Sequence, residues 1–137
     1  MIIVDTREQN PLWSDNIIKQ KLDEGDYTTG NLLNIAHAER KSGIDLYGSI
    51  IQGHTRFRAE INRANDKGLK FAIFVECSEE MFYTKKFSGG YRLKASTKQL
   101  RKMLATMIEK YSLEIVWCED REEMKKLMLE WFDKASV

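Results

Sequence analysis

The stretch that decides the fold is Leu69-Lys70-Phe71-Ala72-Ile73-Phe74-Val75-Glu76-Cys77. It is nearly all apolar and rich in aromatic and β-branched residues, which favour strands. A strand that is apolar on both of its sides is typical of the centre of a sheet whose two faces are covered. We therefore predict a central strand over residues 69–77 with helices packed on both sides of it.

Outward from this strand, apolar runs and turn residues predict the remaining elements. Strands are expected at residues 1–5 and 113–117, and residues 17–41 are expected to form a hairpin that turns near Gly30-Asn31. Helices are expected at residues 44–51, 54–67 and 97–111 and from Asp120 onward, with residues 78–95 irregular. The order β-β-β-α-α-β-α-β-α predicts one α/β domain over residues 1–137, built on a mixed sheet flanked by helices.

The composition is that of one globular domain. The chain has 137 residues, 42% of them hydrophobic and 31% charged, with neither a run of about 20 apolar residues nor an N-terminal secretion signal. The two cysteines, Cys77 and Cys118, lie far apart, each at the end of an apolar run, and we expect buried free thiols. These features predict an intracellular protein, in the cytoplasm or nucleoid, or in the nucleus of a eukaryote.

The charges are distributed unevenly along the chain. The net charge is only +1, yet the segment from Lys85 to Lys110 has eight basic residues and one acid. Such asymmetry suits a protein with one DNA-facing side. The alternative is a solvated helix face together with a charged loop.

A carboxylate and lysine motif lies in the predicted hairpin. Strand alternation directs Glu39 and Lys41 to one face and Arg40 to the other. If Gly25-Asp26 lies across the hairpin, Asp26 reaches the same face as Glu39. Hydrolysis of a phosphodiester needs a metal held by hard oxygen ligands and a cation that orients the nucleophile or stabilises developing charge. This arrangement of acids with a lysine is typical of restriction-type nucleases.

The ordered motif resembles the nuclease domain of the XPF family, which includes the archaeal Hef nuclease. That family has a Gly-Asp pair, a spacer, Glu-Arg-Lys, three residues and Asp, which correspond here to Gly25-Asp26, Glu39-Arg40-Lys41 and Asp45. The resemblance also covers the opening strand at residues 4–8, the helix after the motif and the strand at residues 74–76. It therefore extends over nearly the whole chain.

The resemblance implies a restriction-endonuclease-like three-layer fold and a DNA endonuclease dependent on Mg²⁺ or Mn²⁺. It implies that Asp26 and Glu39 bind the metal, that Arg40 and Lys41 are essential to catalysis, and that Asp5, Glu8 and Asp45 support it. A helix N-cap is the alternative role for Asp45. It also implies a homodimer built from the late helices.

Two departures from the family pattern affect the expected substrate. Residues 10–16 leave room for about two helical turns at most, where the family has a fuller helix. The sequence also ends at Val137 without the tandem helix-hairpin-helix module by which many relatives bind DNA. We therefore expect a stand-alone nuclease domain, with a recruiting protein as one source of the missing module.

Two groups of basic residues are candidates for DNA binding. The first follows the motif and comprises Arg56, Arg58 and Arg63. The second interleaves with aromatic residues in the irregular segment and comprises Lys85, Lys86, Arg92 and Lys94. Basic side chains on phosphates and rings on unpaired bases would suit a junction or a single strand. The alternatives are solvated helix charges for the first group and a flap packed on the domain for the second.

The leading hypothesis is a metal-dependent endonuclease that cleaves branched, flapped or junction-containing DNA. One alternative is a catalytically silent DNA-binding or scaffold subunit of a nuclease complex. Such subunits tend to lose the acids and the lysine, whereas every motif position is filled here. Another alternative is a four-way-junction resolvase, but Arg40 and Asp45 favour the XPF type.

Overall fold

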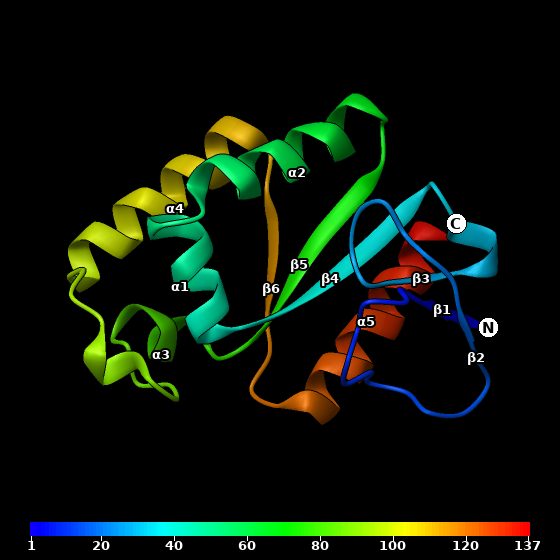
Figure 1. Ribbon diagram of the computed structural model, residues 1–137, viewed down its shortest axis with the longest axis horizontal. Helices are drawn as coiled ribbons and strands as arrows, with labels where there is room; N and C mark the ends of the chain where they lie inside the picture. Colours follow the sequence, from blue (N-terminus) through cyan, green and yellow to red (C-terminus); the bar gives the residue numbers. More distant parts are fainter.

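The computed structural model describes all residues, 1–137, and shows a six-stranded sheet between two layers of helices (Figure 1). The strands are β1 (Ile2–Val4), β2 (Ile17–Lys19), β3 (Tyr27–Thr29), β4 (Ala36–Ser42), β5 (Lys70–Glu76) and β6 (Glu114–Trp117). The α-helices are α1 (Gly43–Ile51), α2 (His54–Asp66), α3 (Glu79–Tyr83), α4 (Thr97–Tyr111) and α5 (Arg121–Ala135). Short 3₁₀ helices occupy Gly30–Leu32 and Gly90–Arg92.

The sheet is mixed, with the strand order β2-β1-β3-β4-β5-β6. β4, β5 and β6 run parallel to one another, and β3 is antiparallel to both β1 and β4. Parallel strands need crossover connections, which here are α1 and α2 between β4 and β5, and α3 and α4 between β5 and β6. The predicted three-layer α/β fold is confirmed.

The central strand β5 separates two hydrophobic cores. Phe71, Ile73 and Val75 pack against the layer formed by α1, α2, α3 and α4. The alternate residues Ala72 and Phe74 face the other core, to which α5 contributes Met124, Met128 and Trp131. Both sides of this strand are buried, which explains why the stretch lacks the apolar-polar alternation of a half-exposed strand.

Helix caps fix the boundaries of the later helices. The Ser96 side chain accepts a hydrogen bond from the Gln99 N–H, and the Gln99 side chain accepts one from the Ser96 N–H, so α4 starts with a capping box. The Asp120 side chain accepts from the Glu123 N–H at 2.8 Å and caps α5. Each cap satisfies backbone donors that the first helical turn leaves free. Both helix starts agree with the sequence prediction.

The structure corrects two predictions of local structure. Residues 17–41 do not form one hairpin: within this range only β3 and β4 are antiparallel partners, and β2 pairs parallel to β1. The segment 78–95 is not wholly irregular, because Ser78 caps the short helix α3. Residues 10–16 contain no helix, which agrees with the short space that the sequence leaves there. The three-residue strand β2 has two exposed side chains, so it lacks the apolar run from which strands are recognised.

Two further observations concern the surface and the thiols. None of the helices is long and apolar enough to span a bilayer. The two cysteines are free and buried, as predicted. Burial raises the pKa of the Cys77 thiol to about 11 and that of Cys118 to about 12, so both stay protonated and unreactive near neutral pH.

Candidate functional site

The alternation of β4 places Glu39 and Lys41 on the side of the sheet that faces α2. Lys41 Nζ lies 3.5 Å from Glu39 Oε2 and 5.3 Å from the centre of the Phe57 ring on α2. Arg40 points to the opposite side, where its guanidinium binds Glu8. Glu39 and Lys41 therefore lie on one side of β4, and Arg40 lies on the other side, where it forms an ion pair with Glu8.

Asp26 lies where the sheet opens between β3 and β4. The two strands share a single bridge, between Tyr27 and Ala38, and the Asp26 N–H donates to the Ala38 carbonyl at 2.8 Å. Beyond this point no strand covers the edge of β4. Instead Asp26 Oδ2 accepts the Arg40 N–H at 2.8 Å, while Asp26 Oδ1 accepts no hydrogen bond from the protein. One carboxylate oxygen therefore fixes the side chain to β4 and the other remains a free donor atom.

Gly25 turns the chain into this position. Its φ is +81°, a left-handed conformation that side chains disfavour. A Cβ at this position would lie 3.1 Å from the Ala38 oxygen and 3.2 Å from Phe71 Cε1. The glycine of the Gly-Asp pair is therefore required both by backbone conformation and by close packing against β4 and β5.

Gly25→Ala is expected to destabilise the fold by about 2 kcal/mol, mostly from the left-handed conformation. The matched control is Gly48→Ala in α1, where an added Cβ meets no atom within 4 Å and alanine favours the helix by about 0.5–1 kcal/mol. Urea denaturation of the two variants measures both effects. Equal stability of the Gly25→Ala variant and the parent would contradict this account of the motif.

Asp5 and Glu8 have different partners. Asp5 is buried, and its carboxylate accepts from the Leu22 N–H at 2.7 Å and from Arg7 Nε at 2.8 Å. These bonds lower its pKa against the effect of burial, which raises it. Both of its oxygens are thus occupied by donors from the loop after β1 and from the segment after β2. The structure places Asp5 as an anchor for these segments.

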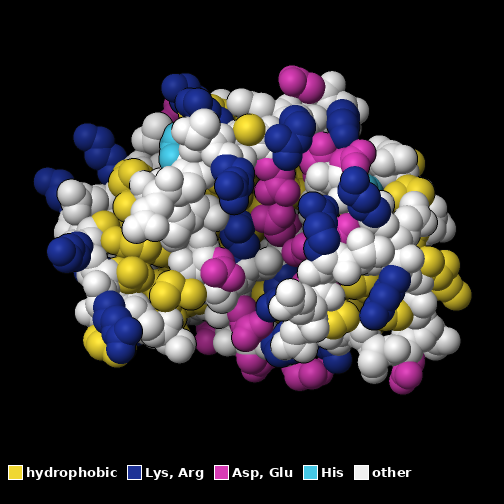
Figure 2. Space-filling model, viewed as in Figure 1, with side chains coloured by type: hydrophobic (Ala, Val, Ile, Leu, Met, Phe, Trp, Pro, Cys, Tyr) yellow, Lys and Arg dark blue, Asp and Glu magenta, His cyan; other side chains and the backbone are white.

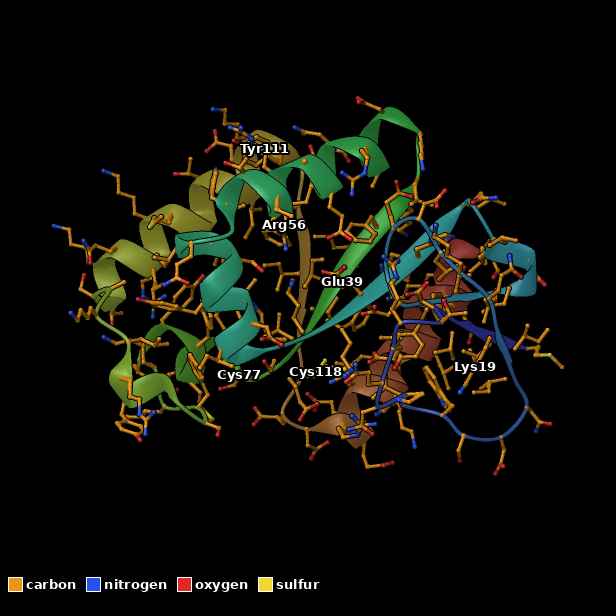
Figure 3. All side chains as sticks on the ribbon, in the orientation of Figure 1. Lys19, Glu39, Arg56, Cys77, Tyr111 and Cys118 are labelled. Atoms are coloured by element: carbon orange, nitrogen blue, oxygen red, sulfur yellow. The ribbon has the colours of Figure 1, made fainter.

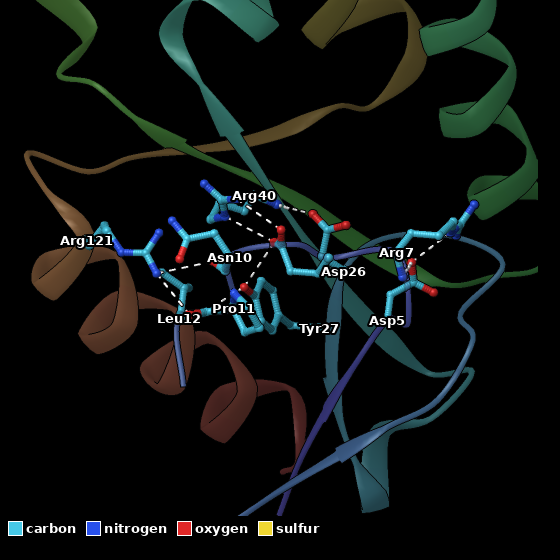
Figure 4. Close-up of polar contacts among 10 residues, drawn as sticks. Asp5, Arg7, Asn10, Pro11, Leu12, Asp26, Tyr27, Arg40 and Arg121 are labelled. Atoms are coloured by element: carbon cyan, nitrogen blue, oxygen red, sulfur yellow. Dashed lines mark hydrogen bonds and ion pairs between the residues drawn. The ribbon is translucent and has the colours of Figure 1, made fainter. Parts of the chain in front are cut away.

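Glu8 belongs to a second network (Figure 4). Arg40 Nε and Nη2 donate to the two oxygens of Glu8 at 3.1 and 3.0 Å, and the Tyr27 hydroxyl donates to Glu8 Oε2 at 3.0 Å. The same hydroxyl accepts the Leu12 N–H at 2.9 Å. In the same close-up Arg121 of α5 donates to the carbonyls before Leu12. This network ties β4 to the loop after β1.

Glu39 and Asp26 are half-buried acids whose pKa values are raised. Burial raises the pKa of Asp26 to about 6 despite the hydrogen bond from the Arg40 N–H. Burial and the neighbouring charge of Glu60 raise the pKa of Glu39 well above its ordinary value, although Lys41 opposes them. Such shifts in two adjacent carboxylates are typical of functional sites, where the fold tolerates unfavourable charge.

Glu60 is the residue that the sequence did not reveal. It lies on α2, and its negative charge contributes to the raised pKa of Glu39. In sequence it looks like an ordinary polar position between Phe57 and Ile61, the apolar residues from which the helix was predicted. Only the packing of α2 over β4 brings it to the motif, so no local signal could have found it.

An open groove of about 810 Å³ adjoins the acids. Lys41 and Glu60 line it together with Arg7, Asp45, Arg56 and Arg63 and the small residues Gly48, Ser49 and Gly53. Figure 2 shows acidic side chains along the middle of this face with lysines and arginines on either side. Figure 3 shows Glu39 in the middle of the sheet and Arg56 near the start of α2. The groove thus combines the acids Asp45 and Glu60 with exposed arginines such as Arg56 and Arg63.

The candidate DNA-binding residues divide between two places. Arg56 and Arg63 line the groove, whereas Arg58 does not, and Arg63 Nε also lies 3.7 Å from a Glu24 oxygen. The remaining candidates lie on the segment 84–95, which packs on the start of α1: Phe87 abuts Gly43, and Ile44 abuts Gly89. Lys85 donates to the Leu93 carbonyl, while Lys86, Arg92 and Lys94 lie at the surface.

Some aromatic residues in and next to this segment pack on the domain, and one is exposed and could contact an unpaired base. These are the two alternatives that the sequence left open. Tyr83 is buried and Phe87 stacks on Phe82 at 5.9 Å between ring centres, so both pack on the domain. Tyr91 is 78% exposed, and the Arg92 guanidinium lies 5.2 Å from its ring centre. Only Tyr91 is free to stack on another molecule.

Asp45 does not cap α1. The N-cap is Ser42, whose hydroxyl accepts the Asp45 N–H at 3.2 Å. Asp45 itself lies in the first turn of the helix, is exposed and lines the groove. The alternative of an N-cap role for Asp45 is therefore wrong.

The side chains present fit a divalent cation bound mainly through water. No three side chains from His, Cys, Asp and Glu come close enough to enclose a metal ion among them. Asp26 Oδ1 and the carboxylate of Glu39, whose cationic partner is Lys41 at 3.5 Å, are the available hard oxygen donors. Mg²⁺ is commonly bound by one or two carboxylates and keeps several of its waters. Asp26 and Glu39 supply two such carboxylates.

The chain has relatives of known family and fold. The ERCC4 domain model matches residues 4–130. Two solved structures of XPF from Aeropyrum pernix are similar to this chain. The first has 19% sequence identity and a TM-score of 0.73, and the match covers 99% of this chain. The second, in complex with DNA, has 21% identity and a TM-score of 0.68, and the match covers 98% of this chain. This chain spans 66% and 64% of those two chains. No curated protein matches it.

The fold of the chain is similar to that of XPF. The chain belongs to the ERCC4 domain family. The resemblance seen in the sequence motif is thereby confirmed, as is the mixed sheet with flanking helices that the resemblance implied.

Proposed function

We propose that the chain is an endonuclease that hydrolyses phosphodiester bonds in branched, flapped or junction-containing DNA with the help of Mg²⁺ or Mn²⁺. The observation that supports this most is the grouping of Asp26, Glu39 and Lys41 at the opening between β3 and β4, beside a groove with exposed arginines. Membership of the ERCC4 domain family and the similar fold of XPF, one structure of which contains DNA, point the same way.

Each side chain has a distinct role in this proposal. Asp26 and Glu39 hold the divalent ion, which would acidify water and neutralise charge on the scissile phosphate. Lys41, fixed between Glu39 and the Phe57 ring, orients the nucleophile or stabilises the charge that develops on the phosphate. Arg40 positions Asp26 through its backbone N–H and braces β4 through Glu8.

The groove residues Arg56 and Arg63 would bind phosphates of the DNA, since exposed guanidinium groups form strong bidentate contacts with phosphate. Arg7 also lines the groove, but its guanidinium is held by Asp5 and the Leu22 carbonyl. On the segment 84–95, Tyr91 with Arg92 would contact an unpaired base next to a junction. Lys86 and Lys94 would contact the backbone beside it.

Residues 1–137 act as one nuclease domain in this proposal, and the chain works inside the cell, where two buried free thiols stay reduced. We also propose a homodimer that uses the late helices, supported by Met103 and Ile108, which leave 36% and 40% of their area exposed on α4. A further protein would supply additional DNA contacts. Light scattering on the purified chain measures the oligomeric state.

The test is a cleavage assay with labelled flap, fork, four-way and linear duplex DNA in Mg²⁺, Mn²⁺ or EDTA. We expect cleavage of branched DNA that needs the metal and that falls at least about 100-fold in Lys41→Ala. The matched control is Lys126→Ala, which removes an exposed lysine from α5. Binding without any cleavage would favour a silent scaffold subunit, and equal cleavage of linear duplex would remove the claim of structure specificity.

A further inference from the structure

Glu24 is a buried acid in the loop between β2 and β3, directly before the Gly25-Asp26 pair. Its side chain is only 3% exposed, and Lys67 at the end of α2 donates to both of its oxygens, at 2.8 and 3.0 Å. His37 Nδ1 lies 2.8 Å from the Glu24 carbonyl oxygen and donates to it, because the other ring nitrogen accepts the Asn34 N–H. The loop before Asp26 is thus attached to α2 by the Glu24 side chain and to β4 by its backbone.

A second cation lies at the same carboxylate. Arg63 Nε is 3.7 Å from Glu24 Oε1, close enough for an ion pair but too far for a hydrogen bond. Arg63 precedes Lys67 by one helical turn, so both side chains reach the same acid. A buried acid needs a cationic partner with good hydrogen bonds, and Lys67 alone supplies it. The burial of Glu24 therefore does not require Arg63, and the position of Arg63 needs another explanation.

The Arg63 side chain is 56% exposed and lines the open groove. Its ion pair with Glu24 uses Nε, which leaves the two terminal Nη groups, with most of the N–H donors of a guanidinium, for another acceptor. Arg56, which also lines the groove, lies seven residues earlier on the same face of α2, about 10 Å along the helix axis. That separation equals the axial rise of about three phosphates on one DNA strand. The two arginines therefore suit a DNA backbone that follows α2.

We propose that Glu24 is a positioning residue, which holds the Arg63 guanidinium at the groove in readiness for a phosphate of the DNA backbone. This inference rests on the proposed function and deepens it. A long side chain loses rotational freedom when it binds, and a guanidinium that is already held loses less. Lys67 neutralises Glu24, so the acid does not repel the phosphate. Because Glu24 directly precedes Gly25-Asp26, it also fixes this phosphate contact relative to Asp26, the proposed metal ligand.

The test is binding of labelled fork DNA to the full chain in EDTA, measured by fluorescence anisotropy at several salt concentrations. Arg63→Gln is expected to weaken binding about 10-fold, as the loss of one charged hydrogen-bonding group does, and to reduce the salt slope by about 1. Glu24→Gln is expected to weaken binding roughly 2- to 10-fold, the usual cost of immobilising one long side chain, although it removes a negative charge. In the Arg63→Gln background, Glu24→Gln should no longer weaken binding.

The matched control is Asp23→Asn, which removes the same charge from the neighbouring residue. The Asp23 side chain is 72% exposed and also lines the groove, so its neutralisation is expected to tighten DNA binding or to leave it unchanged. Net charge alone predicts the same sign for Glu24→Gln. Opposite effects of the two substitutions would therefore identify a positioning role for Glu24.

The outcomes separate this inference from the function on which it rests. If the parent binds the fork and Glu24→Gln does not weaken binding, or weakens it equally with and without Arg63, the role of Glu24 is refuted and DNA binding stands. If the parent binds no DNA, the inference is refuted, and the cleavage assay decides the proposed function separately. Thermal unfolding checks that each variant is folded. Should Glu24→Gln not fold, Glu24→Asp replaces it: the charge opposite Lys67 is kept, the carboxylate is withdrawn from Arg63, and the same Arg63-dependent loss is expected.

Discussion

Glu39→Gln is expected to abolish DNA cleavage and to stabilise the metal-free protein. Glutamine is a poor ligand for a hard cation, and the loss of a preorganised charged group at a site of this kind costs on the order of 10³-fold in rate. The fold gains because the buried carboxylate, whose pKa burial and Glu60 raise, opposes folding when it is ionised. Removal of such a functional group commonly stabilises a protein by about 0.5–2 kcal/mol.

The stabilisation should depend on pH with a defined sign. Because the pKa of Glu39 is higher in the folded state, the folded protein holds a proton that the unfolded chain releases. The parent is therefore stabilised at low pH and loses stability as the pH rises from the ordinary glutamate pKa through the raised one. The Glu39→Gln variant lacks this loss, so its advantage appears at neutral pH and disappears at acid pH.

Urea denaturation in EDTA across this pH range measures the effect, and the cleavage assay measures the rate. The matched control is Glu130→Gln, an exposed position on α5, which should change neither quantity appreciably. A Glu39→Gln variant that still cuts DNA at the parent rate would remove Glu39 from the site. If this variant unfolds at lower urea than the parent at neutral pH, the electrostatic account is contradicted.

Glu8→Ala is expected to destabilise the fold by about 3 kcal/mol, since the removal of one member of a buried ion pair leaves the other charge without its partner. The Glu8 side chain is only 8% exposed and that of Arg40 is 20% exposed. The Tyr27 hydroxyl also loses its acceptor. The effect lies at the lower end of the usual range because water can reach part of the guanidinium.

A double-mutant cycle with Arg40→Ala checks the cause. When both members are removed, no unpaired charge remains, so the double variant should lose less stability than the sum of the single variants, by about 1–3 kcal/mol. The surface pair of Lys125 and Glu122, at 3.6 Å with Glu122 84% exposed, is the control, and Glu122→Ala should cost under about 0.5 kcal/mol. Simple additivity at Glu8 and Arg40 would contradict a direct ion pair.

The sequence predicted the long elements and the motif because their signals are local. β5 was expected at 69–77 and lies at Lys70–Glu76, and α4 begins after the Ser96 cap. The separation of Glu39 and Lys41 from Arg40 follows from the two-residue period of a strand alone. The antiparallel pairing of β3 with β4, which brings Asp26 to β4, was visible in the turn residues at Gly30-Asn31.

Features that depend on packing between distant segments could not be predicted. β2 joins the sheet beside β1 although two of its three residues are exposed, and no periodicity marks such an edge strand. Nothing in the sequence showed that Arg40 would bind Glu8, since the contact joins segments 32 residues apart. Glu60 escaped notice for the same reason, because it reaches Glu39 only through the docking of α2 on the sheet.

The position of β4 has a consequence for amide hydrogen exchange. All seven residues of β4 pair with β5, in the interior of the sheet, so the β4 amides that donate to β5 exchange with solvent only when these two strands separate. The segment 84–95 belongs to no strand and exposes Lys86, Tyr91, Arg92 and Lys94, so its amides are expected to exchange faster, through local opening. We therefore expect Glu39 and Lys41 to keep their backbone positions for as long as β4 and β5 stay paired, while the amides of the basic segment exchange through smaller local openings.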